Sequence, residues 1–272
     1  MLVQLVLSLL DSTMNITPIP AFSDNYIWAI ANETDAWLVD PGQYAPASRY
    51  LKQKHLRLAG ILLTHHHPDH QAGVPEFLAE QAVPVVGPRA ENIPVVTHVV
   101  GQADQILLAP FDLTLNVLGV PGHTLEHIAF FGNIANAPRL FCGDTLFAGG
   151  CGRLLEGTAL QMWQSLIKLS ALSAQTQVYC AHEYTVSNLK FARLVDPDNK
   201  ALENRLISAQ RTRAGGQPTL PSTIELEKAT NPFLRAGHPA LMASAANFLQ
   251  APILDIVHSF ATLRKWKDKV VL

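Results

Sequence analysis

The chain carries the sequence Leu62-Leu63-Thr64-His65-His66-His67-Pro68-Asp69-His70, in which four histidines and one aspartate fall within six positions. The apolar run 59–63 predicts a buried strand, and the polar residues around Pro68 predict the loop that leaves it. Imidazole and carboxylate groups at a strand end are ligands suited to zinc or iron. Two histidines at i and i+2 can reach one metal ion while Asp69 and His70 turn towards a second. The stretch therefore predicts a metal site rather than a polar turn that happens to be rich in histidine.

The composition is that of a globular protein with enough apolar residues for a core. The chain has 272 residues, of which 48% are hydrophobic and 15% charged, so we expect one large domain or two smaller ones. A net charge of −2 provides no general basic field for nucleic acid or an acidic membrane. Three cysteines are an odd number without close pairing, which favours reduced thiols and a cytoplasmic location.

The N-terminal residues 1–10 are almost wholly apolar. About ten residues are too few to cross a bilayer, which needs roughly 20. No positive charge precedes the run, as it would in a secretory signal. Because Met14 follows just before a strand-like segment, we expect residues 1–13 to be an extension outside the fold, with a degenerate signal peptide as the alternative.

Short strand-like runs alternate with tight turns and helices up to about residue 185. The expected strands are 26–31, 36–39, 59–63, 83–86, 111–120, 128–131, 140–142 and 177–180, and the expected helices are 46–54, 74–81 and 159–169. After residue 185 the expected elements are helices, at 187–195, 198–209, 224–229, 239–249 and 260–268. The sequence therefore predicts a mixed α/β domain over residues 14–185, followed by a smaller helical domain over 186–272.

Three more candidate ligands also follow predicted strands. His123 comes after the strand 111–120, Asp144 after 140–142 and His182 after 177–180. Loops that a rigid sheet positions are where binding and catalytic sites are commonly built. We therefore expect these side chains to belong to the same site as the His-rich stretch.

The His-rich stretch resembles the T-H-x-H-x-D-H signature of the metallo-β-lactamase superfamily. Three later motifs resemble the remaining ligand motifs of that superfamily, in the same order: Pro121-Gly122-His123-Thr124, Phe141-Cys142-Gly143-Asp144-Thr145 and Ala181-His182-Glu183-Tyr184-Thr185. Further motifs are similar to those of the glyoxalase II, or hydroxyacylglutathione hydrolase, family: Asp24-Asn25-Tyr26, Gly150-Cys151-Gly152-Arg153, Asn188-Leu189-Lys190-Phe191-Ala192 and Asn231-Pro232-Phe233-Leu234-Arg235. The resemblance extends over nearly the whole chain from Met14 onward.

This resemblance implies an αβ/βα sandwich fold with a smaller C-terminal helical, glutathione-binding domain. It also implies an enzyme that hydrolyses the thioester of S-(2-hydroxyacyl)glutathione, chiefly S-D-lactoylglutathione. The products would be glutathione and D-lactate, in the second step of methylglyoxal detoxification. The nucleophile implied is a hydroxide shared by two divalent metal ions, zinc first, with iron or manganese as alternatives. Its parent water would have a pKa lowered towards about 7.

The resemblance also assigns roles to the candidate ligands. One metal ion would be held by His65, His67 and His123, and the other by Asp69, His70 and His182, with Asp144 bridging both. Asp69 and Asp144 would be the catalytic residues. The leaving group is a thiolate of pKa roughly 8.5–9, so strong help from a general acid is unnecessary and we expect no dedicated acid residue.

Four further residues are expected to bind the glutathione part of the substrate. Arg264 and Lys267, at i and i+3 of the last predicted helix, share a face and could clamp a carboxylate. Arg153 and Tyr184 match family positions that contact the tripeptide. A solvated basic helix is the alternative for the first pair. The chain departs from the family at Leu155, where an aromatic residue often helps to contact glutathione.

The remaining histidines and cysteines have structural explanations. His66 would point away from the metals, and His127 begins a strand, so we expect packing roles for both. Cys142 and Cys180 lie in predicted strands and should behave as small hydrophobic residues. Cys151 follows Asp144 in a loop and is expected to be more exposed, but no additional His–Asp pair is left to activate a catalytic thiol.

Several other functions compete with this interpretation. A metallo-β-lactamase proper usually lacks the bridging Asp and needs no helical C-terminal region. A persulfide dioxygenase of the same superfamily would use one iron, and a nuclease would need a basic surface. A binding protein that is not an enzyme would be expected to have lost ligands, and none is missing. The expected partner is therefore a small-molecule substrate, S-D-lactoylglutathione, with no nucleic acid and no membrane, and we expect a monomer.

Overall fold

The computed structural model describes residues 14–270, and the expected extension over residues 1–13 lies outside them. The chain folds as two compact units. The first contains the residues up to Gly119 together with Glu126–Gly143. The second contains Val120–Leu125 and the chain from Asp144 onward. The expected domain boundary between residues 185 and 186 stays a prediction.

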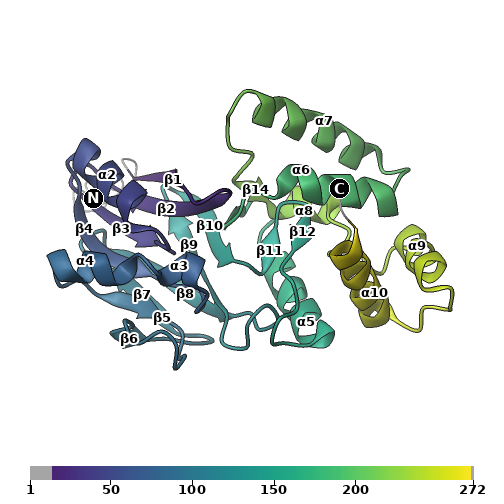
Figure 1. Ribbon diagram of the computed structural model, residues 1–272, viewed down its shortest axis with the longest axis horizontal. Helices are drawn as coiled ribbons and strands as arrows, with labels where there is room; N and C mark the ends of the chain where they lie inside the picture. The colour runs from purple at the N-terminus through teal and green to yellow at the C-terminus, as the bar shows by residue number, and fades with distance from the viewer. Residues whose placement is uncertain (1–13, 271–272) are drawn as a thin grey trace, which may run out of the picture. The chain divides into compact units, whose positions relative to one another are not determined.

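The first unit contains a mixed six-stranded sheet (Figure 1). Its strands, in spatial order, are β1 (Asn15–Ala21), β2 (Asn25–Ala31), β3 (Asp35–Val39), β4 (Arg57–Leu62), β5 (Val85–Gly87) and β6 (His98–Val99). Strand β2 pairs antiparallel with β1 and β3, whereas β3 to β6 run parallel. The four strands expected between residues 26 and 86 are confirmed to within two residues at each end.

Helices α2 (Tyr44–Lys54) and α4 (Val74–Glu80) pack on one face of this sheet (Figure 1). Strand side chains point alternately to the two faces. Ile27 and Ala29 of β2 accordingly join the core under the helices, whereas Trp28 points to the opposite face. All three are at most 2% exposed, so β2 is a central strand that is buried on both sides.

Four antiparallel strands of a second sheet belong to the same unit. They lie in the order β10 (Ala137–Gly143), β9 (Ile128–Ile134), β8 (Leu113–Gly119) and β7 (Gln105–Leu108). Trp37 of β3 donates a hydrogen bond from Nε1 to the carbonyl of Ala109, at 2.8 Å. The indole thus joins the first sheet to the connection between β7 and β8. Strand β7, in which three of the four residues are apolar, was not predicted.

The second unit consists mainly of helices. It holds two short antiparallel pairs, β11 (Leu146–Phe147) with β12 (Gly150–Cys151) and β13 (Gln177–Cys180) with β14 (Ser222–Thr223). Its helices are α5 (Ala159–Ser170), α6 (Thr185–Val195), α7 (Lys200–Ala214), α8 (Ile224–Thr230), α9 (Pro239–Leu249) and α10 (Ile256–Lys269). Every helix expected after residue 158 is present.

Two predicted details of the helices are wrong. The helix expected from residue 198 begins later, because Asn199 is the N-cap of α7 and its side chain accepts a hydrogen bond from the amide of Leu202. The same helix continues to Ala214, beyond the expected end at residue 209. Arginine has a high intrinsic helix propensity, so Arg211 and Arg213 allow α7 to continue without a regular apolar pattern. Among residues 14–270, no helix is long and apolar enough to cross a membrane.

Helix α5 begins with a complete capping box at Thr158. The Thr158 hydroxyl accepts a hydrogen bond from the amide of Gln161, and the Gln161 side chain accepts one from the amide of Thr158. Two amides that the helix itself leaves unpaired are thereby satisfied.

Replacing Thr158 by alanine should lower the free energy of unfolding by about 1 kcal/mol, because it removes the capping acceptor. Urea unfolding followed by circular dichroism measures the change. The matched control is Ser170→Ala in the last turn of α5, where the Ser170 hydroxyl donates to the carbonyl of Ile167. A loss for Thr158→Ala no larger than that of the control would contradict the capping role.

Candidate metal and substrate site

Strand β4 delivers the His-rich stretch from a fully buried position. Ile61, Leu62 and Leu63 are each 0% exposed. Residues 64–67 form the connection, and a short helix, α3 (Pro68–Gln71), follows with proline in its first turn. Asp69 and His70 therefore lie on a helical turn and not in the open loop that the sequence suggested.

The carboxylate of Asp40 organises this turn. It accepts hydrogen bonds from the Thr64 amide at 2.8 Å and the Thr64 hydroxyl at 2.7 Å. It also lies 3.0 Å from Nδ1 of His70. An ionised carboxylate can only accept, so Nδ1 of His70 carries the hydrogen and the lone pair is left on Nε2. Asp40 thereby presets His70 for metal binding, the usual task of a carboxylate behind a ligating histidine.

The backbone near Asp40 is shaped for this contact. Asp40 has φ 51°, a left-handed conformation that is uncommon outside glycine. Two residues later, a Cβ on Gly42 would lie 1.8 Å from the carbonyl oxygen of Asp69, so only glycine fits there. The turn is thus packed directly against α3. No local pattern predicts this role of Asp40, because its partners Thr64 and His70 lie 24 and 30 positions further along the chain.

The other donors of the first unit are also held in place. Nε2 of His65 lies 3.0 Å from Nδ1 of His67. The ring of His65 stacks on that of His127, with centroids 4.5 Å apart, which fits the structural role expected for His127. Asn25 donates to Oδ2 of Asp69 at 2.9 Å and was a second residue that the sequence analysis left without a role.

In the second unit, Asp144 lies between two histidines. Its Oδ2 is 3.4 Å from Nε2 of His123, and its Oδ1 is 3.3 Å from Nε2 of His182. Nδ1 of His123 is 2.9 Å from the carbonyl of Arg153, which only accepts, so the His123 lone pair is on Nε2. Each oxygen of one carboxylate therefore faces a different imidazole.

These donors suit a divalent cation. Imidazole nitrogens with their lone pairs at Nε2 and ionised carboxylates are ligands of zinc, iron and manganese. Backbone and carboxylate acceptors behind the histidines fix the tautomers that can bind. The chemistry of both sets fits metal binding.

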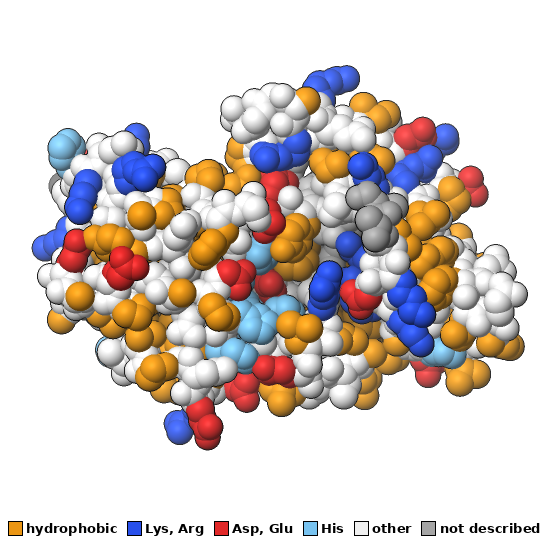
Figure 2. Space-filling model, in the orientation of Figure 1, with side chains coloured by type: hydrophobic (Ala, Val, Ile, Leu, Met, Phe, Trp, Pro, Cys, Tyr) orange, Lys and Arg blue, Asp and Glu red, His pale blue; other side chains and the backbone are white. Residues whose placement is uncertain are grey.

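The expected substrate residues lie in the second unit, and Lys and Arg side chains gather over α10 (Figure 2). The side chain of Arg153 is 74% exposed, and its Nε lies 3.7 Å from Asp268. Arg264, by contrast, is only 4% exposed. It donates to the carbonyl of Cys151 at 2.8 Å and to Asp268 at 3.0 Å, and it lies over the ring of Phe233.

Lys267 occupies a partly buried position next to this cluster. Burial first, and then the neighbouring Arg264 charge, lower the pKa of Lys267 to about 8. Its Nζ lies 5.8 Å from the centroid of the Phe191 ring. Leu155, the departure from the family pattern, is 59% exposed. Among these side chains, Lys267 and Arg153 are therefore better placed than Arg264 to meet an anion directly.

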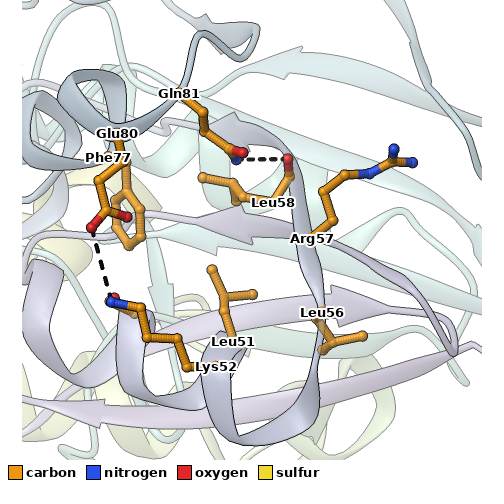
Figure 3. Close-up of a pocket in the computed structure, with 9 residues that line it drawn as sticks. Leu51, Lys52, Leu56, Arg57, Leu58, Phe77, Glu80 and Gln81 are labelled. Carbon is orange, nitrogen blue, oxygen red and sulfur yellow. Dashed lines mark hydrogen bonds and ion pairs between the residues drawn. The ribbon is translucent and has the colours of Figure 1, made fainter.

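A separate surface pocket in the first unit lacks these features (Figure 3). It has a volume of about 140 Å³ and lies between α2, β4 and α4. Its floor is aliphatic and aromatic, and Lys52 and Glu80 on its rim lie 3.9 Å apart. Gln81 donates to the carbonyl of Leu58. The pocket residues include no histidine, aspartate or cysteine, so this pocket is not the candidate site.

Comparisons with known proteins define the class first. The family model described as metallo-beta-lactamase superfamily matches residues 22–182, and the model described as hydroxyacylglutathione hydrolase C-terminus matches residues 183–270. A solved metallo-beta-lactamase from Staphylococcus aureus superposes with a TM-score of 0.62 at 22% identity, covering 94% of this chain and 72% of that one. The expected metallo-β-lactamase fold is confirmed.

Closer relatives then give the family. Hydroxyacylglutathione hydrolase of Hahella chejuensis is 50% identical over 255 residues, covering 93% of this chain and 98% of the relative. The corresponding protein of Nitrosomonas europaea is 46% identical over 255 residues, covering 94% and 96%. The chain belongs to the hydroxyacylglutathione hydrolase family of the metallo-β-lactamase superfamily. It is accordingly a thioester hydrolase, and the resemblance inferred from its motifs is confirmed.

The three cysteines are buried, which corrects the expectation for Cys151. Cys151 lies in β12 and is 3% exposed, because Arg264 and its neighbours cover the strand. Burial raises the pKa of the Cys151 thiol, and burial raises that of Cys180 to about 12. A thiol is a nucleophile only as thiolate, so none of this favours a catalytic cysteine.

Native protein at pH 8 should react with a thiol reagent far more slowly than protein unfolded in guanidinium, because all three thiols are buried and the pKa values of Cys151 and Cys180 are raised. Absorbance at 412 nm with Ellman's reagent follows the reaction. Fast labelling of one thiol in the native protein, assigned by peptide mapping, would contradict this burial.

Proposed function

We propose that the chain hydrolyses the thioester of S-(2-hydroxyacyl)glutathione, chiefly S-D-lactoylglutathione, to glutathione and D-lactate, the second step of methylglyoxal detoxification. The observation that carries the proposal is the near full-length similarity to hydroxyacylglutathione hydrolases, including the C-terminal region. The two donor sets and the basic residues of α10 supply the chemistry that such a reaction needs. Loss of the thioester absorbance at 240 nm, measured with the purified protein, tests the proposal.

We propose two divalent metal ions per chain, zinc first. His65, His67 and His123 would hold one ion, and Asp69, His70 and His182 the other, with Asp144 shared by both. Support comes from the number of donors, since seven ligand residues exceed the roughly four to six that one ion takes. The two oxygens of Asp144, each facing one imidazole, also support a shared ligand.

The side chains have separate tasks in this chemistry. When bound, the two cations would supply Lewis acidity, which lowers the pKa of a water towards about 7 and stabilises negative charge on a carbonyl oxygen. Asp69, held by Asn25, would accept a hydrogen bond from the attacking water and orient it. Asp144 would fix the distance between the ions. A thiolate leaves without a proton, so no acid residue is needed.

The glutathione part of the substrate would be bound by Arg153, Tyr184, Arg264 and Lys267. The contacts of these side chains support separate tasks. The Arg264 guanidinium already binds Cys151 and Asp268, so it would also hold the strand and the acidic partner in place. Lys267 and the exposed Arg153 would meet the carboxylate. A carboxylate bound by these side chains gains charge-assisted contacts.

We further propose a cytoplasmic monomer that binds neither nucleic acid nor membrane. The net charge of −2 supports the absence of nucleic-acid binding, since no general basic field exists. Among residues 14–270 none of the cysteines forms a disulfide, which suits a reducing compartment.

The alternative of a persulfide dioxygenase is not favoured by the relatives, which are named hydroxyacylglutathione hydrolase. Such an enzyme also takes a glutathione substrate but consumes oxygen with a single iron. Oxygen uptake on glutathione persulfide, measured beside thioester loss on S-lactoylglutathione, separates the two. Oxygen consumption without thioester loss would reject the hydrolase.

Asp144→Ala should lower both metal content and kcat far more than His66→Ala. Asp144 supplies charge that both ions would share, whereas His66 is no proposed ligand. Elemental analysis should give about two ions per chain for the wild type. Equal losses in the two variants, or full activity with one ion per chain, would reject the assignment.

Lys267→Ala should raise KM about tenfold and leave kcat nearly unchanged. A charge-assisted contact is worth roughly 1.5–3 kcal/mol, and this one is made equally in the ground and transition states. With the pKa of Lys267 at about 8, the amine is charged below pH 8 and neutral above it. KM of the wild type should therefore rise as pH increases through 8.

The matched control is Lys267→Arg, since a guanidinium stays charged over this range. The KM of Lys267→Arg should stay nearly constant as pH increases through 8. Unchanged KM in Lys267→Ala at low salt, or the same pH profile in Lys267→Arg, would show that Lys267 does not bind the substrate.

A further inference from the structure

Two aromatic rings, those of Tyr184 and Phe147, pack against the imidazole of His182 in the second unit. The ring of Tyr184 is stacked on the imidazole, with centroids 4.7 Å apart and planes 7° from parallel. Phe147 meets both rings edge-on, with centroids 5.8 Å from His182 and 5.3 Å from Tyr184. Stacked and edge-on pairs at these distances are the favoured aromatic geometries. The Tyr184 ring thus covers one face of the His182 imidazole, and the Phe147 ring lies against it at nearly a right angle.

This packing bears on the atom that would bind a metal. Nε2 of His182 lies 3.3 Å from Oδ1 of Asp144. Rotation of the imidazole about its Cβ–Cγ bond would swing Nε2 away from that position, and this torsion has only broad intrinsic preferences. A ring stacked flat on the imidazole opposes that rotation, because turning the imidazole would drive its edge into the Tyr184 ring.

Phe147 is itself fixed by a buried polar network. Asn231 donates from Nδ2 to the carbonyls of Phe147 at 3.2 Å and Gly150 at 2.9 Å. Glu227, which is 0% exposed, accepts from the amide of Gly149 at 2.8 Å and is paired with Arg205. Buried polar groups that are fully hydrogen-bonded make their surroundings rigid. The turn between β11 and β12 therefore presents Phe147 at a set position.

We propose that Phe147 and the ring of Tyr184 are positioning residues that clamp the imidazole of His182 in the plane from which Nε2 binds a metal ion. The clamp rests on the proposed function, because it takes His182 as a metal ligand. Tyr184 then has two separable parts. Its ring orients His182, whereas its hydroxyl is the group expected to contact glutathione.

Zinc affinity of the purified variants tests the clamp, by competition with a chromophoric chelator and without any thioester. Phe147→Leu and Tyr184→Leu should weaken the binding of one zinc ion by about tenfold or more, the range seen when groups behind metal ligands are removed. Tyr184→Phe keeps the ring and should bind both ions within about twofold of the wild type. The same variant should raise KM for S-lactoylglutathione, because only the hydroxyl is lost.

The matched control is Phe260→Leu, which removes a ring that is 0% exposed and lies against Trp163 and Phe233. It should lower the melting temperature but leave zinc affinity unchanged. The clamp is overturned if Phe147→Leu weakens zinc no more than Phe260→Leu, or if Tyr184→Phe loses as much affinity as Tyr184→Leu. Should Phe147→Leu fail to fold, the Tyr184 pair decides alone. A wild type that binds zinc but leaves the thioester intact would reject the proposed function and not the clamp.

Discussion

The carboxylate of Asp40 is the interaction on which the first unit's donors depend. A buried carboxylate is costly unless hydrogen bonds satisfy it, and Asp40 receives them from Thr64 and His70. The same contacts fix the start of the His-rich stretch and the tautomer of the proposed ligand His70. Asp40 makes them from a left-handed backbone, a conformation that persists only when the surrounding structure offsets its cost. One side chain therefore joins the folding of this turn to the orientation of a candidate metal donor.

In the second unit, a candidate donor is also held in one orientation, but by ring stacking and not by a carboxylate. His182 is oriented by ring stacking, and the turn that supports Phe147 is fixed by Glu227 and Asn231. Both of these lie in the part of the chain that matches the C-terminal family model. The buried polar residues of the helical region thus also fix the turn that carries Phe147, next to the proposed ligand His182.

The sequence alone predicted the strands and helices well, because apolar periodicity and caps such as Thr158 are local signals. It also predicted the family, since the motifs are specific to it, whereas the assignment of the ligands stays a prediction. It did not predict the supporting residues. The roles of Asp40 and Asn25 arise from pairing across 30 and 44 positions, which no local pattern reveals. The burial of Cys151 was missed for the same reason, because its cover comes from Arg264, 113 residues away.

The burial of Arg264 bears on how this enzyme can evolve. Its guanidinium uses its fork to bind a backbone carbonyl and a carboxylate while lying on an aromatic face, and lysine cannot reproduce that set of contacts. Substitution of Arg264 is therefore disfavoured even if the enzyme comes to prefer a thioester of a different thiol. The exposed side chains of Arg153 and Leu155 have no comparable packing to preserve. Under selection for a different thiol, substitutions at Arg153 and Leu155 would therefore be tolerated first. Helix α10, which carries Arg264, would be retained.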